Sequence, residues 1–307
     1  MIFFLTSFFV SVMASSTPLL LAATGELVTE RSGVLNLGVE GMMLLGAVTG
    51  FIVGLLTGSA LLGLLAAIAG GAALSAIFAF LTLTLMSNQT AAGLALTIFG
   101  RGFSSLLGAG YVGIKGPEPL KLAAPGLSKI PFFGPVLFGQ DALVYASFLI
   151  LAAVAWFLYR THAGLVLRSV GDSHDAAHAI GYPVNAIRLG ATLFGGAMAG
   201  LAGGYMSLAY SPMWAENMTA GRGWIALALV VFATWRPAWL LAGAYLFGAI
   251  MYLSLYVQGL GVAIPSPFIS ALPYIVTVAV LAFIARDRRR IRLNQPACLG
   301  KPFYAGA

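Results

Sequence analysis

Three neutral amide side chains lie where the surrounding sequence is apolar, an unusual place for polar groups. Asn36 lies within the apolar run 34–39, and Asn88 and Gln89 lie in the short polar stretch 86–90 between two long apolar runs. An amide offers donors and acceptors without a charge. It can therefore bind the hydroxyls and ring nitrogens of a neutral solute, whereas a full charge would be costly to desolvate. For Asn88 and Gln89, capping of a helix at a turn is an equally good interpretation.

Charged and flexible residues surround Asn36. The sequence GELVTERSGVLNLGVEG of residues 25–41 holds three glutamates, one arginine and four glycines between two apolar runs. A solvated turn is one interpretation. A broken helix that enters the protein fits the apolar residues around Asn36 better, because irregular backbone within a membrane is tolerated where it lines a cavity. We therefore expect a solute pathway formed by the following residues: Asn36, Gly38, Glu40, Asn88 and Gln89.

A third polar stretch, THAGLVLRSVGDSHDAAHAIGYPVNAI, covers residues 161–187. Asp172 or Ser173 can cap a short helix through Ile180, which Gly181 would end. An exposed helical face there would suit docking to another protein, and an ordinary connector is the alternative. The spacing of His174 and His178 also permits a metal site, although a solvated helix face is the simpler interpretation.

The composition shows what must position these residues. Of the 307 residues, 60% are hydrophobic and 8% are charged, and the stretches 1–25 and 41–100 contain no charged residue. A soluble domain usually carries about 25% charged residues, so lipid is the expected solvent. The apolar runs are continuous and do not alternate with polar residues, which favours helices over a barrel. The fold class is therefore an all-α polytopic helix bundle.

We expect about nine transmembrane helices, since one crossing needs roughly 20 apolar residues. The predicted spans are 2–22, 42–58, 61–85, 91–109, 141–159, 187–209, 219–235, 238–256 and 267–285. The first lacks a basic segment before it, so we expect a retained span and not a cleaved signal peptide. Residues 110–140 carry five prolines and form a predicted loop. Gly196, Gly200 and Gly204 share one helix face, which indicates close helix packing.

The basic residues predict orientation. The net charge is +7, and the arginines gather beside the last span, in the tail 286–307. Because cytoplasmic flanks collect Lys and Arg, the tail and the segment 161–186 are predicted to be cytoplasmic and the loop 110–140 external. The same distribution argues against binding of nucleic acid. The single cysteine, Cys298, excludes an intrachain disulfide and a cysteine-cluster metal site.

These segments resemble one family, over nearly the whole chain. Residues 25–47, GELVTERSGVLNLGVEGMMLLGA, are similar to the signature of ABC importer permeases for nucleosides, within a class that also serves branched-chain amino acids and simple sugars. The stretches MSNQTAAGLAL (86–96) and GRGWIALALVVFATWRP (221–237) also resemble family segments, whereas the proline-rich loop could not be matched.

Residues 167–188, LRSVGDSHDAAHAIGYPVNAIR, resemble the segment through which such permeases contact their ATPase. Within it, Asp175, Ala176, Ala177 and Gly181 resemble the EAA loop, with Asp in place of Glu. The resemblance implies that Arg168, Asp172 and these four residues couple transport to ATP hydrolysis.

The resemblance also implies a bacterial inner-membrane importer with several partners. These are a cytoplasmic ABC ATPase, a second and usually paralogous permease, and a binding lipoprotein or periplasmic protein that delivers the solute. No cofactor is expected. The chain contains no GxxxxGK[ST] phosphate loop, so ATP hydrolysis is expected on the partner.

Three alternatives remain from the sequence. A permease for branched-chain amino acids or simple sugars would share the same architecture. An ion-coupled secondary transporter would need buried acidic residues or histidines within its spans, and the candidates Glu26, Glu30, Glu40 and Glu216 all fall near predicted span ends. A membrane-embedded enzyme is the third, but no HExxH motif or nucleophile elbow is present.

Overall fold

The computed structural model describes residues 2–117, 133–259, 266–284 and 294–304, and within them the chain is helical apart from two isolated β-bridges. The helices, in chain order, are α1 (Ile2–Arg31), α2 (Val39–Thr57), α3 (Ala60–Ala79), η1 (Phe80–Thr84), α4 (Gln89–Gly108), η2 (Ala109–Tyr111), α5 (Phe133–Phe138), α6 (Ala142–Arg160), α7 (His162–Asp172), α8 (His174–Ala179), α9 (Val184–Tyr205), η4 (Met206–Tyr210), α10 (Arg222–Phe232), α11 (Pro237–Gly259) and α12 (Ser266–Ile284).

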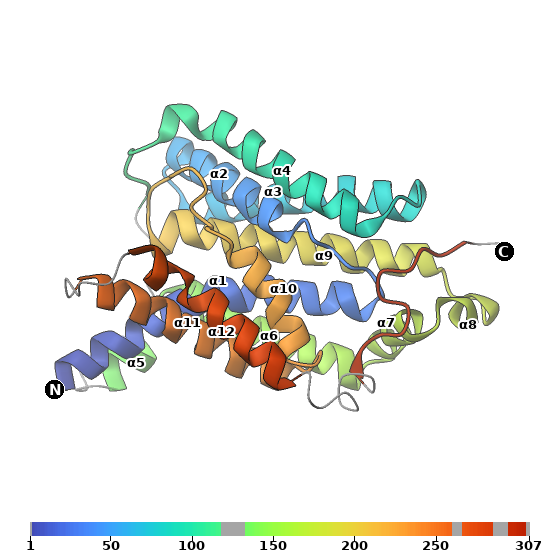
Figure 1. The fold of residues 1–307 in the computed structure, drawn as a ribbon. Coiled ribbons are helices and arrows are strands. Elements are labelled where there is room, and N and C mark those ends of the chain that lie inside the picture. Colours follow the sequence, from blue (N-terminus) through green and yellow to red (C-terminus); the bar gives the residue numbers. More distant parts are fainter. Residues whose placement is uncertain (1, 118–132, 260–265, 285–293, 305–307) are drawn as a thin grey trace.

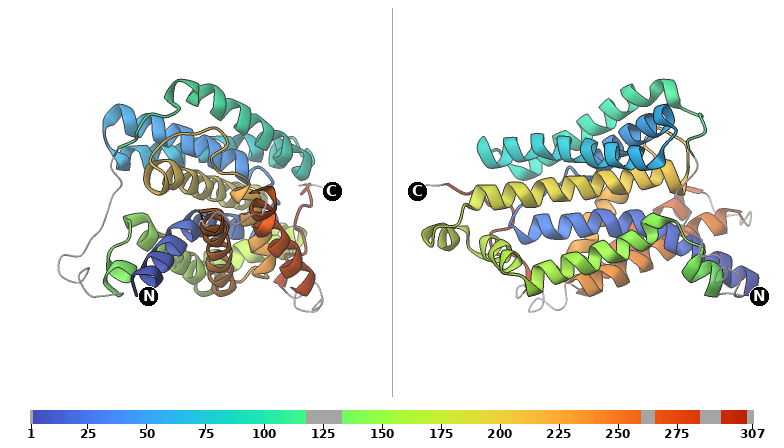
Figure 2. Two further views of the ribbon diagram at one scale, coloured as in Figure 1. Left: turned by 60° about the vertical axis from the view of Figure 1, so that its left-hand side comes forward. Right: turned by 180° about the vertical axis from the view of Figure 1, so that it is seen from behind.

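The long helices form three layers (Figures 1 and 2). Helices α2, α3 and α4 make one outer layer, α1 and α9 make the centre, and α6, α11 and α12 make the other outer layer. Helix α9 packs against α2, α3 and α1, and α1 packs against α6 and α11, so the two central helices together join the outer layers. The predicted polytopic helix bundle is thereby confirmed.

Glycines permit the close packing of α9 against its neighbours. A Cβ atom added at Gly196 would collide with Ser75, and one added at Gly200 would collide with the carbonyl oxygen of Ala67 on α3. A Cβ at Gly204 would meet the Ala67 side chain at 2.5 Å. The predicted role of the glycine stripe in helix contact is confirmed, and a larger residue at Gly200 would have to push two backbones apart.

Seven helices in the described part of the chain are long and apolar enough to cross a membrane. Helix α12 matches an eighth predicted span with 19 residues. The predicted span 219–235 corresponds instead to α10, which has 11 residues, whereas a crossing needs roughly 20. Helix α10 begins in the middle of the bundle and runs to one end of it, as Figure 1 shows.

Two irregular segments interrupt the bundle. Gly33 ends α1 in a left-handed conformation with a φ of 87°, and the backbone stays irregular to Gly38. Residues 211–221 return from η4 into the bundle and reach α10 through left-handed Asn217, Ala220 and Gly221. The predicted break after the first long helix is confirmed, but α1 extends to Arg31 and not to residue 22.

The predicted proline-rich loop is only partly described, since residues 118–132 lie outside the described residues. Its beginning pairs with the segment that follows η4, through isolated bridges of Val112 with Trp214 and of Lys115 with Met213. Most of the arginine-rich part of the tail, residues 285–293, also lies outside the described residues, whereas residues 294–304 lie beside α7 and α8.

Candidate functional site

Glu40 holds the start of the half-helix α10. Its Oε1 atom accepts hydrogen bonds from Thr219 Oγ1 at 2.5 Å and from the Gly221 amide at 2.8 Å. Its Oε2 atom accepts from the Gly223 amide at 2.6 Å. The first amides of a helix have no partner within that helix and carry partial positive charge. A carboxylate from α2 therefore satisfies the exposed end of α10 inside the bundle.

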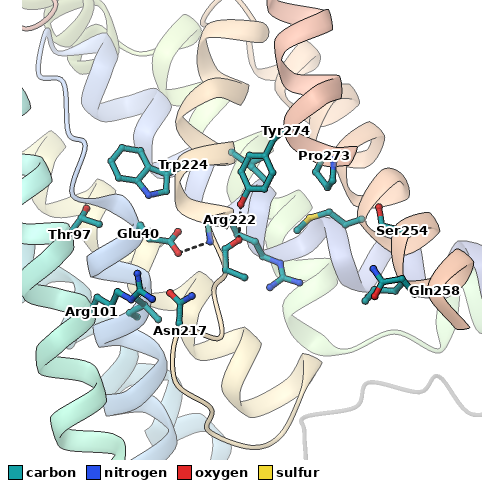
Figure 3. Close-up of a pocket in the computed structure, with 16 residues that line it drawn as sticks. Glu40, Thr97, Arg101, Asn217, Arg222, Trp224, Ser254, Gln258, Pro273 and Tyr274 are labelled. Carbon is teal, nitrogen blue, oxygen red and sulfur yellow. Dashed lines mark hydrogen bonds between the residues drawn. The ribbon is translucent and has the colours of Figure 1, made fainter. Parts of the chain in front are cut away.

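A cavity of about 560 Å3 opens beside this contact. Helices α2, α4, α10, α11 and α12 contribute its walls, with Glu40 and Arg222 at the start of α10 (Figure 3). Trp224 and Tyr274 lie above Glu40 in Figure 3, and Arg101 and Asn217 lie below it. Its volume is within the range of roughly 300–1,000 Å3 that is usual for small-molecule sites. The cavity is therefore large enough for a solute the size of a nucleoside or a sugar.

Several polar groups in the cavity wall are available to a solute. The side chains of Arg101, Asn217 and Gln258 make no hydrogen bond within the described part of the chain, although each lines the cavity. Others are already occupied, since Thr97 donates to Leu37 O at 2.9 Å and Ser254 donates to Ile250 O at 2.9 Å. A guanidinium and two amides beside an aromatic side chain can bind a planar ring that carries carbonyl groups and nitrogens.

Of the predicted pathway residues, only Glu40 lines this cavity. Asn36 is fully buried, and its Oδ1 atom accepts from the Gly38 amide at 2.9 Å while its Nδ2 atom lies 3.3 Å from Met42 Sδ. These bonds close the turn between α1 and α2. Asn36 and Gly38 therefore hold local backbone in this structure, and their contact with solute stays a prediction.

Asn88 and Gln89 lie at the α7–α8 end of the bundle, at the start of α4. Asn88 is exposed and caps α4, because its Oδ1 atom accepts from the Ala91 amide at 3.0 Å. Gln89 is buried, and its Oε1 atom accepts from the Leu35 amide at 2.8 Å, whereas its Nε2 atom has no hydrogen-bond partner in the part of the chain that the structure describes. The helix-cap interpretation thus describes the geometry of Asn88, and a role of either amide in transport stays a prediction.

Glu30 and Arg31 secure the other end of α10. Glu30 Oε2 accepts from Trp235 Nε1 at 2.6 Å, and Arg31 Nη2 donates to Trp235 O at 2.7 Å. The turn they hold contains left-handed Thr234 and Trp235, a strained conformation for bulky residues. Among the described residues, Glu30 and Arg31 form no salt bridge with each other. Both residues bond to the turn after α10, whereas Glu40 bonds to the residues at its start. Side chains of the segment 25–41 therefore hold the segment 221–237 at both of its ends.

The segment 161–186 forms two short helices that meet at Ser173. Ser173 Oγ accepts from the Ala176 amide at 3.3 Å, and Gly181 follows α8 with a φ of 91°. The predicted cap at Ser173 and the predicted end at Gly181 are confirmed. On α8, Asp175 and Ala176 are exposed, whereas Ala177 is buried. On α7, Arg168 is half-buried with its guanidinium 5.1 Å from the Tyr159 ring centre, and Asp172 is exposed.

His174 and His178 do not form a metal site with neighbouring ligands. No group of three His, Cys, Asp or Glu side chains suited to a metal occurs among the described residues. Both rings pack edge-on against Phe303, each with its centre 5.3 Å away. Burial lowers the pKa of His174 below its usual value, Asp175 at 3.6 Å opposes this, and the charges of Arg188 and Lys301 add to it.

The sequence reasoning did not find Arg101, Asn217, Trp224 and Gln258. One signal was available for Arg101, which falls inside the predicted span 91–109, because a charged residue within a span is costly and usually faces a cavity or the bundle interior. Asn217 and Gln258 lie just outside predicted spans, where polar residues are ordinary. Only the re-entry of residues 211–221 brings Asn217 to the cavity.

Comparison with known proteins places these segments in a wider context. A family model described as the permease component of branched-chain amino acid transport systems matches residues 8–284. A putative glucose ABC transporter permease protein of Haloferax volcanii is 42% identical over 93% of this chain and 93% of its own length. A guanosine ABC transporter permease protein of Bacillus subtilis is 34% identical over 95% and 94%. A nucleoside ABC transporter permease protein of Lactococcus lactis is 32% identical over 87% and 88%.

Proposed function

Because this chain belongs to the family of permease components of branched-chain amino acid transport systems, we propose that it carries nucleosides across the membrane as a subunit of an ABC importer. The observation that supports this proposal most is the Glu40 cavity, whose guanidinium and amides beside Trp224 make no side-chain hydrogen bond to any described residue. Two relatives that align over most of this chain are permeases for guanosine or nucleosides. Binding at mid-bundle is also typical of transporters built with discontinuous helices.

The chemistry of the wall favours a purine nucleoside. An arginine can donate two parallel hydrogen bonds to O6 and N7 of guanine. Trp224 offers an aromatic face on which a base can stack, a contact that contributes about 1–3 kcal/mol per base in single-stranded nucleic acid complexes. Asn217 and Gln258 can pair with ribose hydroxyls in either direction, since amides both donate and accept. Glu40 already accepts three hydrogen bonds from the start of α10, so we assign it to positioning α10 and not to binding the base.

The end of the bundle that carries α7 and α8 is proposed to face the cytoplasm. Residues 294–304 lie there, and Arg160, Arg168 and Arg188 belong to the same end, in accord with the enrichment of basic residues on the cytoplasmic side. An ABC ATPase would dock on the exposed surface of α8, where Asp175 and Ala176 face outward. Domain 1–285 would be the permease, with loop 110–140 external and the tail 286–307 cytoplasmic in a plasma or bacterial inner membrane.

The partners follow from this role. A cytoplasmic ATPase would hydrolyse ATP, a second permease, paralogous to this chain, would complete the membrane part, and a binding lipoprotein or periplasmic protein would deliver the nucleoside. A substitution on α8 tests the docking surface. Ala176→Trp should block copurification of the ATPase because Ala176 is exposed, whereas Ala163→Trp, at another exposed alanine on α7, should leave it intact. Normal ATPase assembly with Ala176→Trp would refute this surface.

The test of the function uses the complex purified by a tag on this chain and reconstituted in liposomes. ATP should drive uptake of labelled guanosine, and an excess of unlabelled adenosine should compete while glucose should not. The chain alone should neither hydrolyse ATP nor transport. Guanosine uptake by the lone chain in response to a proton or sodium gradient would favour an ion-coupled transporter and overturn the proposal.

A hexose is the second candidate solute. The relative at 42% identity is a putative glucose permease, and aromatic rings with amides bind sugars as well as nucleosides. The same liposomes separate the two candidates, because strong competition by glucose and none by adenosine would assign the cavity to a sugar.

A further inference from the structure

Residues 294–304 lie across the α7–α8 end of the bundle, and we refer to them as the strap. It is held first by backbone hydrogen bonds. The Cys298 amide donates to Gly171 O at 2.9 Å, and the Gly300 amide donates to Gly33 O at 3.1 Å. Gly171 belongs to α7 and Gly33 to the turn between α1 and α2. The strap therefore bridges α7 and the segment 25–41.

Two arginines add charged contacts to the strap. Arg188 is 1% exposed, and its Nη2 atom donates at 2.8 Å both to Gly33 O and to Lys301 O. Arg31 Nη1 donates to Asn294 O at 3.0 Å, while its other terminal nitrogen holds Trp235 O. Hydrogen bonds from charged donors are roughly twice as strong as neutral ones. The guanidinium of Arg31 thus joins the strap to the turn after α10.

An aromatic side chain fastens the strap to α8. Phe303 is 5% exposed and packs with Val170, Ala177 and Val184 in a small apolar cluster separate from the main core. The rings of His174 and His178 contact its edge. The neighbouring Tyr304 is 53% exposed. Phe303 therefore links the strap to the buried side of α8, opposite the surface that carries Asp175 and Ala176.

The strap is also joined covalently to the cavity wall. Residues 285–293 connect it to α12, whose Pro273 and Tyr274 line the Glu40 cavity. Tyr274 donates to Ala220 O at 3.1 Å, next to the residues that Glu40 holds. A movement of α8 can therefore reach the cavity by two contiguous routes. One passes through Gly33 and Arg31 to the turn after α10, and the other passes from Arg188, which bonds both Gly33 and the strap, to the turn between α1 and α2.

We propose that the strap is a positioning element that transmits movement of α8 to the solute cavity, with Phe303 as its anchor. The inference rests on the proposed function, since it requires an ATPase on α8. Contiguous packing is compatible with two roles. The strap can simply be bound to α8, or its binding can also couple ATP hydrolysis to transport, and the experiment measures the two separately.

The test compares Phe303→Ala with the adjacent control Tyr304→Ala in the reconstituted complex. Cys298 is the one cysteine of the chain and lies in the strap, so its reaction with a maleimide reports how firmly the strap is seated. Phe303→Ala should raise the labelling rate about tenfold, because truncation of a buried phenylalanine favours local opening. It should also lower the guanosine transported per ATP hydrolysed about fivefold. Tyr304→Ala should change neither quantity.

The conservative variant Phe303→Leu keeps most of the apolar contact and should restore both quantities toward wild type. Faster labelling of Cys298 with an unchanged ratio of guanosine transported to ATP hydrolysed would show that Phe303 holds the strap in place without coupling transport to ATP hydrolysis. That result would overturn the inference. Labelling and transport that both match wild type in Phe303→Ala would overturn it as well. Loss of the assembled complex in Phe303→Ala, with no recovery in Phe303→Leu, would assign the strap to folding and contradict the inference. If wild type itself shows no ATP-driven uptake, the proposed function fails and the strap inference fails with it.

Discussion

The α7–α8 end of the bundle and the Glu40 cavity differ in whether their polar side chains make hydrogen bonds within the protein. At the α7–α8 end, Asn36 closes its own turn, and Asn88 and Gln89 accept from neighbouring backbone amides. In the cavity, Arg101 and Asn217 make no hydrogen bond within the described residues. A site for a transported solute needs groups that are unoccupied in the empty protein, because binding must replace water and not an internal bond. On the proposed function, this difference favours recognition of solute in the cavity and mechanical support at the α7–α8 end.

The largest effect is expected from the residue that shapes the cavity. Glu40→Gln keeps the size of the side chain but leaves fewer acceptor positions for three donors. One buried donor without a partner costs about 2 kcal/mol, which corresponds to about a thirtyfold loss of guanosine uptake. Initial uptake rates at matched expression measure this. Glu216→Gln, at an exposed residue outside the cavity wall, is the control and should transport normally. Equal uptake rates for Glu40→Gln and wild type would show that the contacts of Glu40 are not needed for transport, and would contradict the role of the cavity.

A smaller and more specific effect is expected at Arg101. Arg101→Leu should raise the KM for guanosine about tenfold, since a bidentate arginine–guanine pair contributes about 1–3 kcal/mol of discrimination. Arg101→Lys retains the charge but not the planar fork, so its KM should fall between those of Arg101→Leu and wild type. The KM for a pyrimidine nucleoside should change less. An equal rise in the KM for uridine and for guanosine would indicate that Arg101 contacts the ribose and not the base.

At the α7–α8 end, the expected effect of a conservative change is small. Serine and asparagine are both good N-caps, whereas replacing such a cap with an apolar residue costs about 1 kcal/mol. Asn88→Ser should therefore transport guanosine normally, and Asn88→Leu should show a lower melting temperature with modest loss of uptake. A sharp loss of guanosine uptake in Asn88→Ser, at normal stability, would indicate that solute contacts the α7–α8 end. The difference in role between this end and the Glu40 cavity would then not hold.

The smallest expected effect concerns pH at the strap. His174 faces Asp175, Arg188 and Lys301, and burial lowers its pKa, so the folded protein favours the neutral ring. His174 binds the proton more readily when the strap is released, so the contact with Phe303 should weaken as the pH falls below about 6.5, the ordinary pKa of histidine. The rate of Cys298 labelling, corrected for thiolate content, should rise toward pH 5.5 in wild type and not in His174→Gln. A flat profile in wild type would show that His174 does not affect the strap.

The sequence predicts the bundle because lipid selects long apolar helices, and most of the predicted spans occur as helices. The predicted span 219–235 failed for a physical reason. Its hydropathy suits a crossing, but α10 starts at mid-bundle, where Glu40 replaces the missing helical partners across 183 residues of sequence. Local patterns do not contain such a contact. The segment 25–41 stands out in the sequence, but its contacts do not: Glu40 holds the start of α10 and Glu30 the turn after it, and of these two only Glu40 lines the cavity.

Solute is proposed to bind in the Glu40 cavity and not at the α7–α8 end. The most direct measurement uses single cysteines in a Cys298→Ser background, with Ser254→Cys in the cavity wall and Asn88→Cys at the start of α4. Both should react with a small polar thiol reagent in the reconstituted complex. Guanosine should slow the reaction at position 254 by about tenfold when it occupies about nine-tenths of the sites, and it should leave position 88 unchanged. Protection at position 88 without protection at position 254 would contradict the account.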